Sequence, residues 1–275
     1  MMLGAKLRWV DGRFAAVETC DVVDSKALVV DSWLLQEGRA VSLELHLERF
    51  VESCRTHGLG PTELDRARTF WLDALRIMPL EGAWFPRLEI QSTENCVRHL
   101  LWLRPAPHLE TTVTLQTYRG ADVRTLPTVK GPDLEALSAL RVKAQDDGLS
   151  DIVLLNTAGH ILETSSAAIL WWEENCLCIP PVKTGFEKIS SITAKTLMQI
   201  AEVDKIEICQ QIATPIDLAG KEVWVANALH GIRNVTHWTD PIFGEIELNA
   251  VQGRFESWQA KYWSKNQPLG EFCSE

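Results

Sequence analysis

The stretch that most constrains what this chain can fold into runs from Thr128 to Trp172. It places Lys130 at the end of an apolar run, continues with a helical pattern, and then gives two strand-like runs with Glu163 between apolar neighbours. A lysine and a glutamate in apolar surroundings are costly unless each has a partner, and a bound cofactor would partner both. Taken singly, each residue has an ordinary interpretation, because a lysine at a turn is usually solvated and a glutamate in a strand usually points outward.

Length and charge limit the class of protein. A chain of 275 residues can bury one large core or two moderate ones. Its formal net charge of −10 argues against nucleic acid or an anionic membrane as a partner, because both are bound by an excess of Lys and Arg. The sequence has no apolar leader and no apolar run as long as a membrane span. We therefore expect a soluble, cytoplasmic protein.

The seven cysteines follow no regular spacing. Cys176 and Cys178 form a C-x-C pair, but no second Cys or His pair at zinc spacing accompanies it. We expect buried or strand thiols in a reducing compartment, with no disulfide framework and no metal site.

Hydrophobic patterning divides the chain in two. Residues 1–118 are expected to form an N-terminal α+β domain, with strands and two helices at about 43–57 and 63–77. The polar stretch 119–129, which contains Gly and Pro, is the expected linker. Residues 130–275 are expected to form the second domain. Its helices are predicted at about 133–146, capped by Asp133, at about 192–203, and near the C-terminus, with strands between them.

The amino-acid sequence around Glu163 resembles that of a known family. The string LLNTAGHILETSSAAILWW resembles the segment of the class IV aminotransferases in which two strands flank a Gly-containing turn and the second ends in Glu and small hydroxyl residues. Lys130 precedes Glu163 by 163 − 130 = 33 residues, as the family's lysine does. The resemblance implies a two-domain α+β enzyme of fold type IV, with a smaller N-terminal α/β sandwich and a larger, β-barrel-like C-terminal domain with helices. It also implies pyridoxal 5′-phosphate as cofactor, and a homodimer with its active site between the domains.

The same resemblance assigns roles to particular residues. It implies that Lys130 forms the Schiff base with the cofactor, which requires a lysine that can lose its proton near neutral pH. It implies that Glu163 faces the ring nitrogen, and that Arg49, in HLERF, binds the phosphate. The other implied cofactor-binding residues are those of a helix N-terminus and of a turn, namely Ser191, Ile192 and Thr193, and Asn227 and Ala228.

This chain departs from the family pattern at several places. Ala168 stands where Asn is common, Ala194 stands where an arginine is common, and the usual Gly-Asp-Gly stretch before DSWLL is missing. The cation for the substrate carboxylate stays open among four arginines, Arg87, Arg104, Arg119 and Arg124.

Three functions are compatible with these residues. The first is amino-group transfer between an amino acid and a 2-oxo acid. The second is the family's lyase reaction, which releases pyruvate from 4-amino-4-deoxychorismate to give 4-aminobenzoate, with Ser32 in the place of that branch's threonine. The third is an inactive member of the fold, against which the retained Lys130 and Glu163 argue. Amino-group transfer is the principal prediction.

Overall fold

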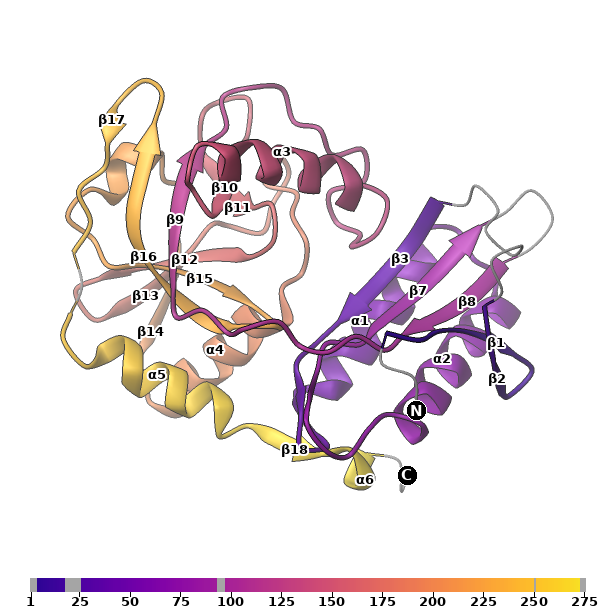
Figure 1. The fold of residues 1–275 in the computed structure, drawn as a ribbon. Coiled ribbons are helices and arrows are strands. Elements are labelled where there is room, and N and C mark those ends of the chain that lie inside the picture. The colour runs from indigo at the N-terminus through magenta and orange to yellow at the C-terminus, as the bar shows by residue number, and fades with distance from the viewer. Residues whose placement is uncertain (1–3, 18–25, 93–96, 250, 273–275) are drawn as a thin grey trace. The chain divides into compact units, whose positions relative to one another are not determined.

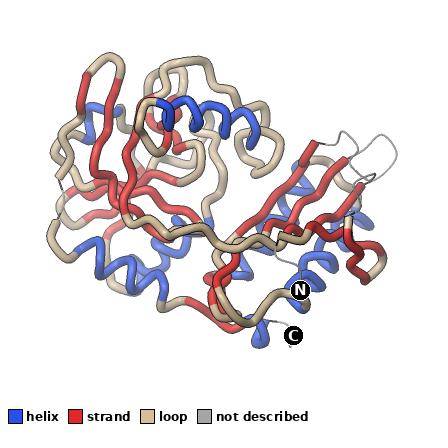
Figure 2. The backbone as a smooth tube through the Cα atoms, viewed as in Figure 1, coloured by secondary structure: helices blue, strands red, loops and turns tan. Residues whose placement is uncertain are grey.

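The computed structural model describes residues 4–17, 26–92, 97–249 and 251–272. The chain divides into two compact units. The first contains residues 1–109, 129–132 and 265–275, and the second contains residues 110–128 and 133–264. Both units combine helices with strands (Figure 2), so the predicted α+β class and the two-domain fold are confirmed.

The first unit packs two helices on one antiparallel sheet. The strand order is β2-β1-β8-β7-β3, and α1 and α2 pack against each other and against this sheet (Figure 1). A second, small sheet has the order β18-β5-β4-β6. The elements of this unit are β1 (Lys6–Val10), β2 (Arg13–Ala16), β3 (Lys26–Ser32), β4 (Leu35–Gln36), β5 (Arg39–Val41), α1 (Leu43–Thr56), α2 (Pro61–Arg76), β6 (Ala83–Trp84), β7 (Arg87–Ser92), β8 (Val97–Trp102), β18 (Asn266–Pro268) and α6 (Leu269–Phe272).

The second unit is built on one long, curled sheet. The strand order is β11-β10-β9-β16-β15-β12-β13-β14, with β17 paired to β16. Helix α3 packs against β10, α4 against β14 and β15, and α5 against β16. The elements of this unit are β9 (Thr112–Thr117), α3 (Leu134–Asp146), β10 (Asp151–Leu155), β11 (Ile161–Thr164), β12 (Ala168–Glu173), β13 (Cys176–Ile179), α4 (Ile192–Val203), β14 (Glu207–Gln210), the 3-10 helix η2 (Pro215–Leu218), β15 (Val223–Asn227), β16 (Gly231–Asp240), β17 (Gly244–Glu245) and α5 (Arg254–Trp263).

The division between the units differs from the predicted one. Strand β9 was placed in the N-terminal domain, yet it pairs with β10 and β16 and so belongs to the second unit. Most of the expected linker, residues 119–128, also packs with the second unit. Lys130 and the described C-terminal residues 265–272 pack with the first unit. Sequence patterning cannot locate these boundaries, because each depends on which distant strand a segment pairs with.

The N-termini of α1 and α3 lack side-chain caps, although Asp133 was the expected cap of α3. Ser42 lies at the N-cap position of α1, but its backbone is left-handed (φ 53°) and its side chain makes no capping hydrogen bond. Asp133 lies at the N-cap position of α3, but its carboxylate accepts hydrogen bonds from Thr125 and from the backbone N–H of Leu126. Ser191 caps α4 as expected, because its Oγ accepts from the backbone N–H of Ala194 at 3.2 Å.

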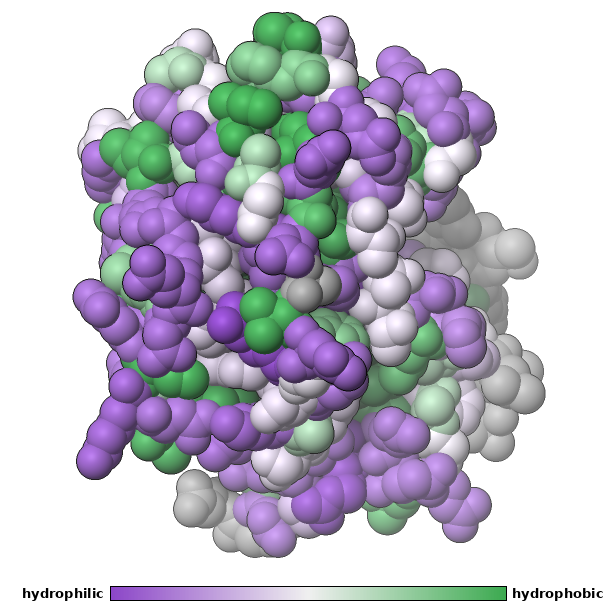
Figure 3. All heavy atoms as spheres, turned by 90° about the vertical axis from the view of Figure 1, so that its left-hand side faces the viewer, coloured by the Kyte–Doolittle hydropathy of each residue, from purple (hydrophilic) through white to green (hydrophobic). Residues whose placement is uncertain are grey.

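The surface facing the viewer in Figure 3 is largely hydrophilic, with separate hydrophobic patches between the polar residues. Isolated apolar residues of this kind are normal on protein surfaces. Among the described residues, no helix has both the length and the apolar character needed to cross a bilayer.

Candidate active site

Lys130 lies beside strand β3 in the first unit. Residues 128–132 form turns and bends. The carbonyl of Lys130 accepts a hydrogen bond from the backbone N–H of Val30 at 2.7 Å. A Cβ at the next residue, Gly131, would lie 2.3 Å from the carbonyl oxygen of Leu28, so only glycine lets this segment approach β3 so closely. The sequence Lys-Gly therefore fixes where the lysine stands.

Burial and neighbouring cations both act on the lysine ammonium. Burial lowers the pKa of Lys130 to about 8, and Arg49, Arg87 and Arg104 lower it in the same direction, while Asp31 opposes them. An amine with this pKa is neutral far more often at physiological pH than a solvated lysine is.

Asp31 is the carboxylate that acts on Lys130, and it is fully buried. It pairs with Arg49, and one of its oxygens lies 2.9 Å from Nδ1 of His46. Although burial alone would raise it, the pKa of Asp31 is held well below its usual range by Arg49 and His46. Burial lowers the pKa of His46, and Asp31 acts in the opposite direction. Ser32, at the end of β3, is buried and donates its backbone N–H to Asp31 at 2.8 Å.

Two further arginines add positive charge to the surroundings of Lys130 in the first unit. The Nε of Arg87 donates to Glu89 at 2.8 Å, and the Nε of Arg104 donates to the carbonyl of Phe85 at 3.2 Å. Burial lowers the pKa of Arg104, and Arg87 lowers it further. Lys130 and the arginines that act on it thus form a group of charged side chains in the first unit. The group has four cations and two carboxylates, namely Lys130, Arg49, Arg87 and Arg104, and Asp31 and Glu89. The excess positive charge fits an anionic ligand such as a phosphate or a carboxylate.

Glu163 lies on β11 in the second unit and is only 5% exposed. Burial raises its pKa to about 7, and Arg124, Lys188 and the N–H of Ile189 act in the opposite direction. A guanidinium nitrogen of Arg124 lies 2.5 Å from Oε1 of Glu163, and the N–H of Ile189 donates to the same oxygen at 3.5 Å. A carboxylate held in this way can face a protonated ring nitrogen.

Arg124 was left open among candidates for the substrate carboxylate, and the structure gives it a different partner. Its guanidinium joins Glu163 and Asp122, and its side chain is 2% exposed. The sequence around Arg124 does not predict this buried ion pair, because Glu163 lies 39 residues further along the chain.

The hydroxyl residues after Glu163 converge on one buried carboxylate. Asp151 accepts hydrogen bonds from the hydroxyls of Thr164 at 2.9 Å and Ser166 at 2.6 Å, and from that of Ser165. Ser166 also accepts, at its carbonyl, a bond from the side-chain amide of Asn227 at 3.4 Å. The motif E-T-S-S thus holds the turn between β11 and β12 in one geometry, which fixes the direction of Glu163.

The other implied cofactor-binding residues lie at two chain turns of the second unit. Ser191, Ile192 and Thr193 open α4, whose first turn contains no acidic residue, so its N-terminus is suited to an anion. The hydroxyl of Thr193 is buried 3.4 Å from that of Tyr262. Asn227 ends β15 and accepts from the N–H groups of Leu229 and His230, which forms the turn that contains Ala228. Sequence analysis thus selected Lys130 and Arg49, which the first unit brings together, and six residues of the second unit.

Comparisons with known proteins agree with this geometry. A family model for amino-transferase class IV matches residues 28–238, and the chain therefore belongs to the class IV aminotransferase family. It is thus a pyridoxal-phosphate-dependent enzyme. No curated protein gives a significant match.

Solved structures with the same fold cover nearly the whole chain. A branched-chain aminotransferase from Thermoproteus uzoniensis, solved with norvaline, is 18% identical with a TM-score of 0.77, and the match covers 97% of this chain and 100% of that chain. A hypothetical aminotransferase from Mycobacterium tuberculosis in its apo form is 15% identical with a TM-score of 0.76, over 97% and 99% of the two chains. A putative 4-amino-4-deoxychorismate lyase from Legionella pneumophila is 16% identical with a TM-score of 0.67, over 86% and 90%. At these identities the likeness concerns the fold.

Proposed function

We propose that this protein is an aminotransferase that moves an amino group between an amino acid and a 2-oxo acid, with Lys130 as the residue that bonds to the cofactor. The observation that carries the proposal is the pKa of Lys130, which burial and three arginines lower to about 8. At pH 7 about a tenth of such lysines are neutral, against about one in three thousand at the ordinary pKa of 10.5. Only the neutral amine is a nucleophile and a proton acceptor.

The residues fit pyridoxal phosphate at both of its ends. The proposed phosphate ligands are Arg49 of the first unit and the N-terminus of α4, at Ser191, Ile192 and Thr193. The turn at Asn227 and Ala228 is the other proposed cofactor-binding segment. Glu163, kept partly ionised by Arg124, is the proposed partner of the ring nitrogen. When bound, the cofactor supplies an aldehyde that bonds amines and a ring that accepts electrons from the substrate carbon.

The chain's own groups then have separate tasks. Lys130, once free, holds and moves a proton at the substrate carbon. Arg87 and Arg104 supply positive charge for the substrate carboxylates. Among the interactions described above, these two arginines share a single carboxylate, that of Glu89, so positive charge is in excess. By analogy with the family, we expect a homodimer.

A lyase that releases pyruvate from 4-amino-4-deoxychorismate is the second candidate. It is supported by Ser32, a buried hydroxyl residue beside Asp31 at the end of β3, where the lyase branch has a threonine. A third candidate, an inactive member of the fold, would leave the lowered pKa of Lys130 and the Arg124 pair without a role.

The test compares two lysine variants. Protein incubated with pyridoxal phosphate should absorb visible light, and borohydride should fix one cofactor per chain to Lys130. Lys130→Ala should abolish the adduct, and Lys143→Ala, at an exposed residue of α3, should leave it unchanged. A cofactor adduct that persists in Lys130→Ala would contradict the assignment.

A paired assay separates the two reactions. Amino donors should convert the bound cofactor to its amine form if the enzyme is a transaminase, and a panel of L- and D-amino acids identifies the donor. Pyruvate release from aminodeoxychorismate without that conversion would instead select the lyase.

A further inference from the structure

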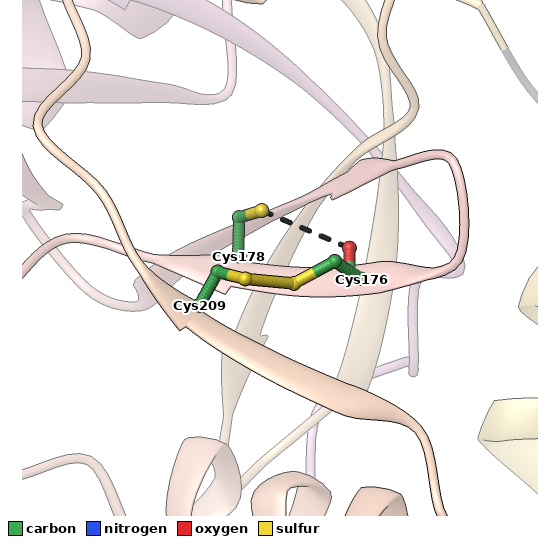
Figure 4. Close-up of side chains that lie close together, drawn as sticks. All are labelled: Cys176, Cys178 and Cys209. Carbon is green, nitrogen blue, oxygen red and sulfur yellow. Dashed lines mark hydrogen bonds between the residues drawn. A yellow bond between two sulfur atoms is a disulfide. The ribbon is translucent and has the colours of Figure 1, made fainter.

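Three cysteines gather on one face of the large sheet, outside the cofactor-binding residues. Cys176 and Cys209 form a disulfide, which the sequence analysis did not expect, and Cys178 lies next to it (Figure 4). The three sulfur atoms all lie within 4.8 Å of one another. The prediction that all cysteines are free thiols is therefore wrong for Cys176 and Cys209.

Strand geometry brings these sulfurs together. Cys176 and Cys178 are two residues apart on β13, so their side chains point to the same face of the sheet. Strand β14 runs parallel to β13, and its Cys209 is directly opposite Cys178 in the register, whereas Cys176 is opposite Glu207. Cys209 is thus bonded to its diagonal neighbour while a free thiol stands directly across from it.

The surroundings give the three cysteines different properties. Cys178 is fully buried in the apolar core of the second unit. Burial raises its pKa to about 11, so most of it is the protonated thiol at neutral pH and only the small thiolate fraction reacts. Cys176 and Cys209 are partly exposed, so a small thiol in solution can reach them. The S–S bond uses two of the three sulfurs, which argues for redox chemistry rather than for a thiolate site for a soft metal ion.

We propose that Cys176, Cys178 and Cys209 form a thiol–disulfide exchange site in which Cys209 pairs with either Cys176 or Cys178. In the exchange, deprotonated Cys178 attacks the sulfur of Cys209, the Cys176–Cys209 bond breaks, and Cys176 leaves as a thiolate that takes up the proton. No electron enters or leaves in this step. A small dithiol opens the site fully by giving two electrons and two protons and closing into its own disulfide.

The exchange site joins the outermost strand of the sheet to its neighbour. In the described part of the chain, β14 ends the sheet path and pairs only with β13. It follows α4, which also packs against it. Either cysteine pairing cross-links β14 to β13, and reduction removes the cross-link. The third cysteine therefore preserves the cross-link when one of its two possible partners for Cys209 is lost.

Peptide mapping of single variants tests the site. Full-length protein, equilibrated in a glutathione buffer and then alkylated, is digested with trypsin, which places Cys209 alone on peptide 206–221 and the other two cysteines on peptide 144–183. We expect these peptides to be linked in the parent protein, in Cys176→Ser and in Cys178→Ser, and to be unlinked in Cys209→Ser. Cys54→Ser, which removes a buried free thiol on α1, is the matched control and should leave the linkage unchanged.

Each alternative gives a distinct result. Linkage in Cys178→Ser without linkage in Cys176→Ser would show a simple disulfide beside an inert thiol, and would overturn the exchange. Absence of linkage in the parent protein at every glutathione ratio would overturn the redox site. One equivalent of copper or zinc in the purified protein, lost in Cys209→Ser, would assign the three sulfurs to a metal instead. None of these readouts depends on the cofactor.

Discussion

Glu163→Gln should make the cofactor-free protein more stable above neutral pH. Burial raises the pKa of Glu163 to about 7, from an ordinary value of 4.5. An acid whose pKa is higher in the folded state stabilises folding when protonated and costs free energy when ionised. The cost is absent below about pH 4.5, grows as the pH rises, and is complete above about pH 7.

The magnitude follows from the two pKa values. Their difference, at about 1.36 kcal/mol for each pKa unit, gives a full cost of about 3.4 kcal/mol. At pH 5.5 the cost is about 1.4 kcal/mol, and at pH 8.5 it is about 3.4 kcal/mol, from the same linkage relation. Glutamine carries no charge and can still accept from Arg124, which keeps Asp122 as its ionic partner. We therefore expect the stability difference between variant and parent to grow by about 2 kcal/mol over this range.

The assay is urea unfolding of both proteins without cofactor, at several pH values between 5.5 and 8.5. Glu135→Gln, at an exposed residue of α3, is the control and should give a difference that does not change with pH. The reasoning is refuted if Glu163→Gln is no more stable than the parent at pH 8.5, or if the gain is the same at every pH. The variant should also bind pyridoxal phosphate more weakly, because the ring nitrogen loses its proposed carboxylate.

Four further predictions follow from particular contacts. The rate of cofactor attachment should rise with pH with a midpoint near 8, measured by stopped-flow absorbance, because the neutral form of Lys130 reacts; a midpoint near 10.5 would contradict the lowered pKa. Gly131→Ala should weaken cofactor binding, measured by fluorescence titration, at least about tenfold, because a Cβ there meets backbone atoms of Leu28. Gly60→Ala is the control and should bind the cofactor normally, because a Cβ there meets nothing within 4 Å. Asp151→Ala should lower the free energy of unfolding by about 3 kcal/mol, because three hydroxyls lose their acceptor; the exposed Asp147→Ala should lose less than about 0.5 kcal/mol. Cys209→Ser should cost about 4 kcal/mol in urea unfolding under oxidising conditions, from the 33-residue separation that the disulfide closes. Cys176→Ser should cost much less, because Cys178 replaces it, and equal costs would count against exchange.

Sequence alone was sufficient where the determining interactions are local. The buried stripe of α1, with Leu47, Phe50, Val51 and Cys54, follows from helical periodicity, and the structure buries all four. The start of α4 at Ser191 was also correct, because a capping side chain acts within three residues. The candidate residues of the site came from a family resemblance that depends on the order and spacing of short motifs.

Sequence failed where the partner is distant. Asp133 looks like a helix cap, but it holds Thr125 and Leu126, a choice that depends on how the preceding segment folds back. Cys176 and Cys209 are 33 residues apart, and only the pairing of β13 with β14 brings them together. Local propensity carries no information on either contact, because both require the register of distant elements.

The two proposed reactive groups show how neighbouring charges act together with burial, which is the larger influence on both pKa values. Burial disfavours charge in both, so it lowers the pKa of Lys130 and raises that of Glu163 toward the same neutral range. The neighbouring charges then separate their roles. Arginines around Lys130 act in the same direction as burial and favour the neutral amine, whereas Arg124 acts against burial and favours the ionised carboxylate. A neutral amine and an ionised carboxylate are what imine chemistry on a protonated ring requires, and cations at both places supply them. The net charge of −10 therefore says little about this site, because the cations that govern it are few and are held close to the groups they act on.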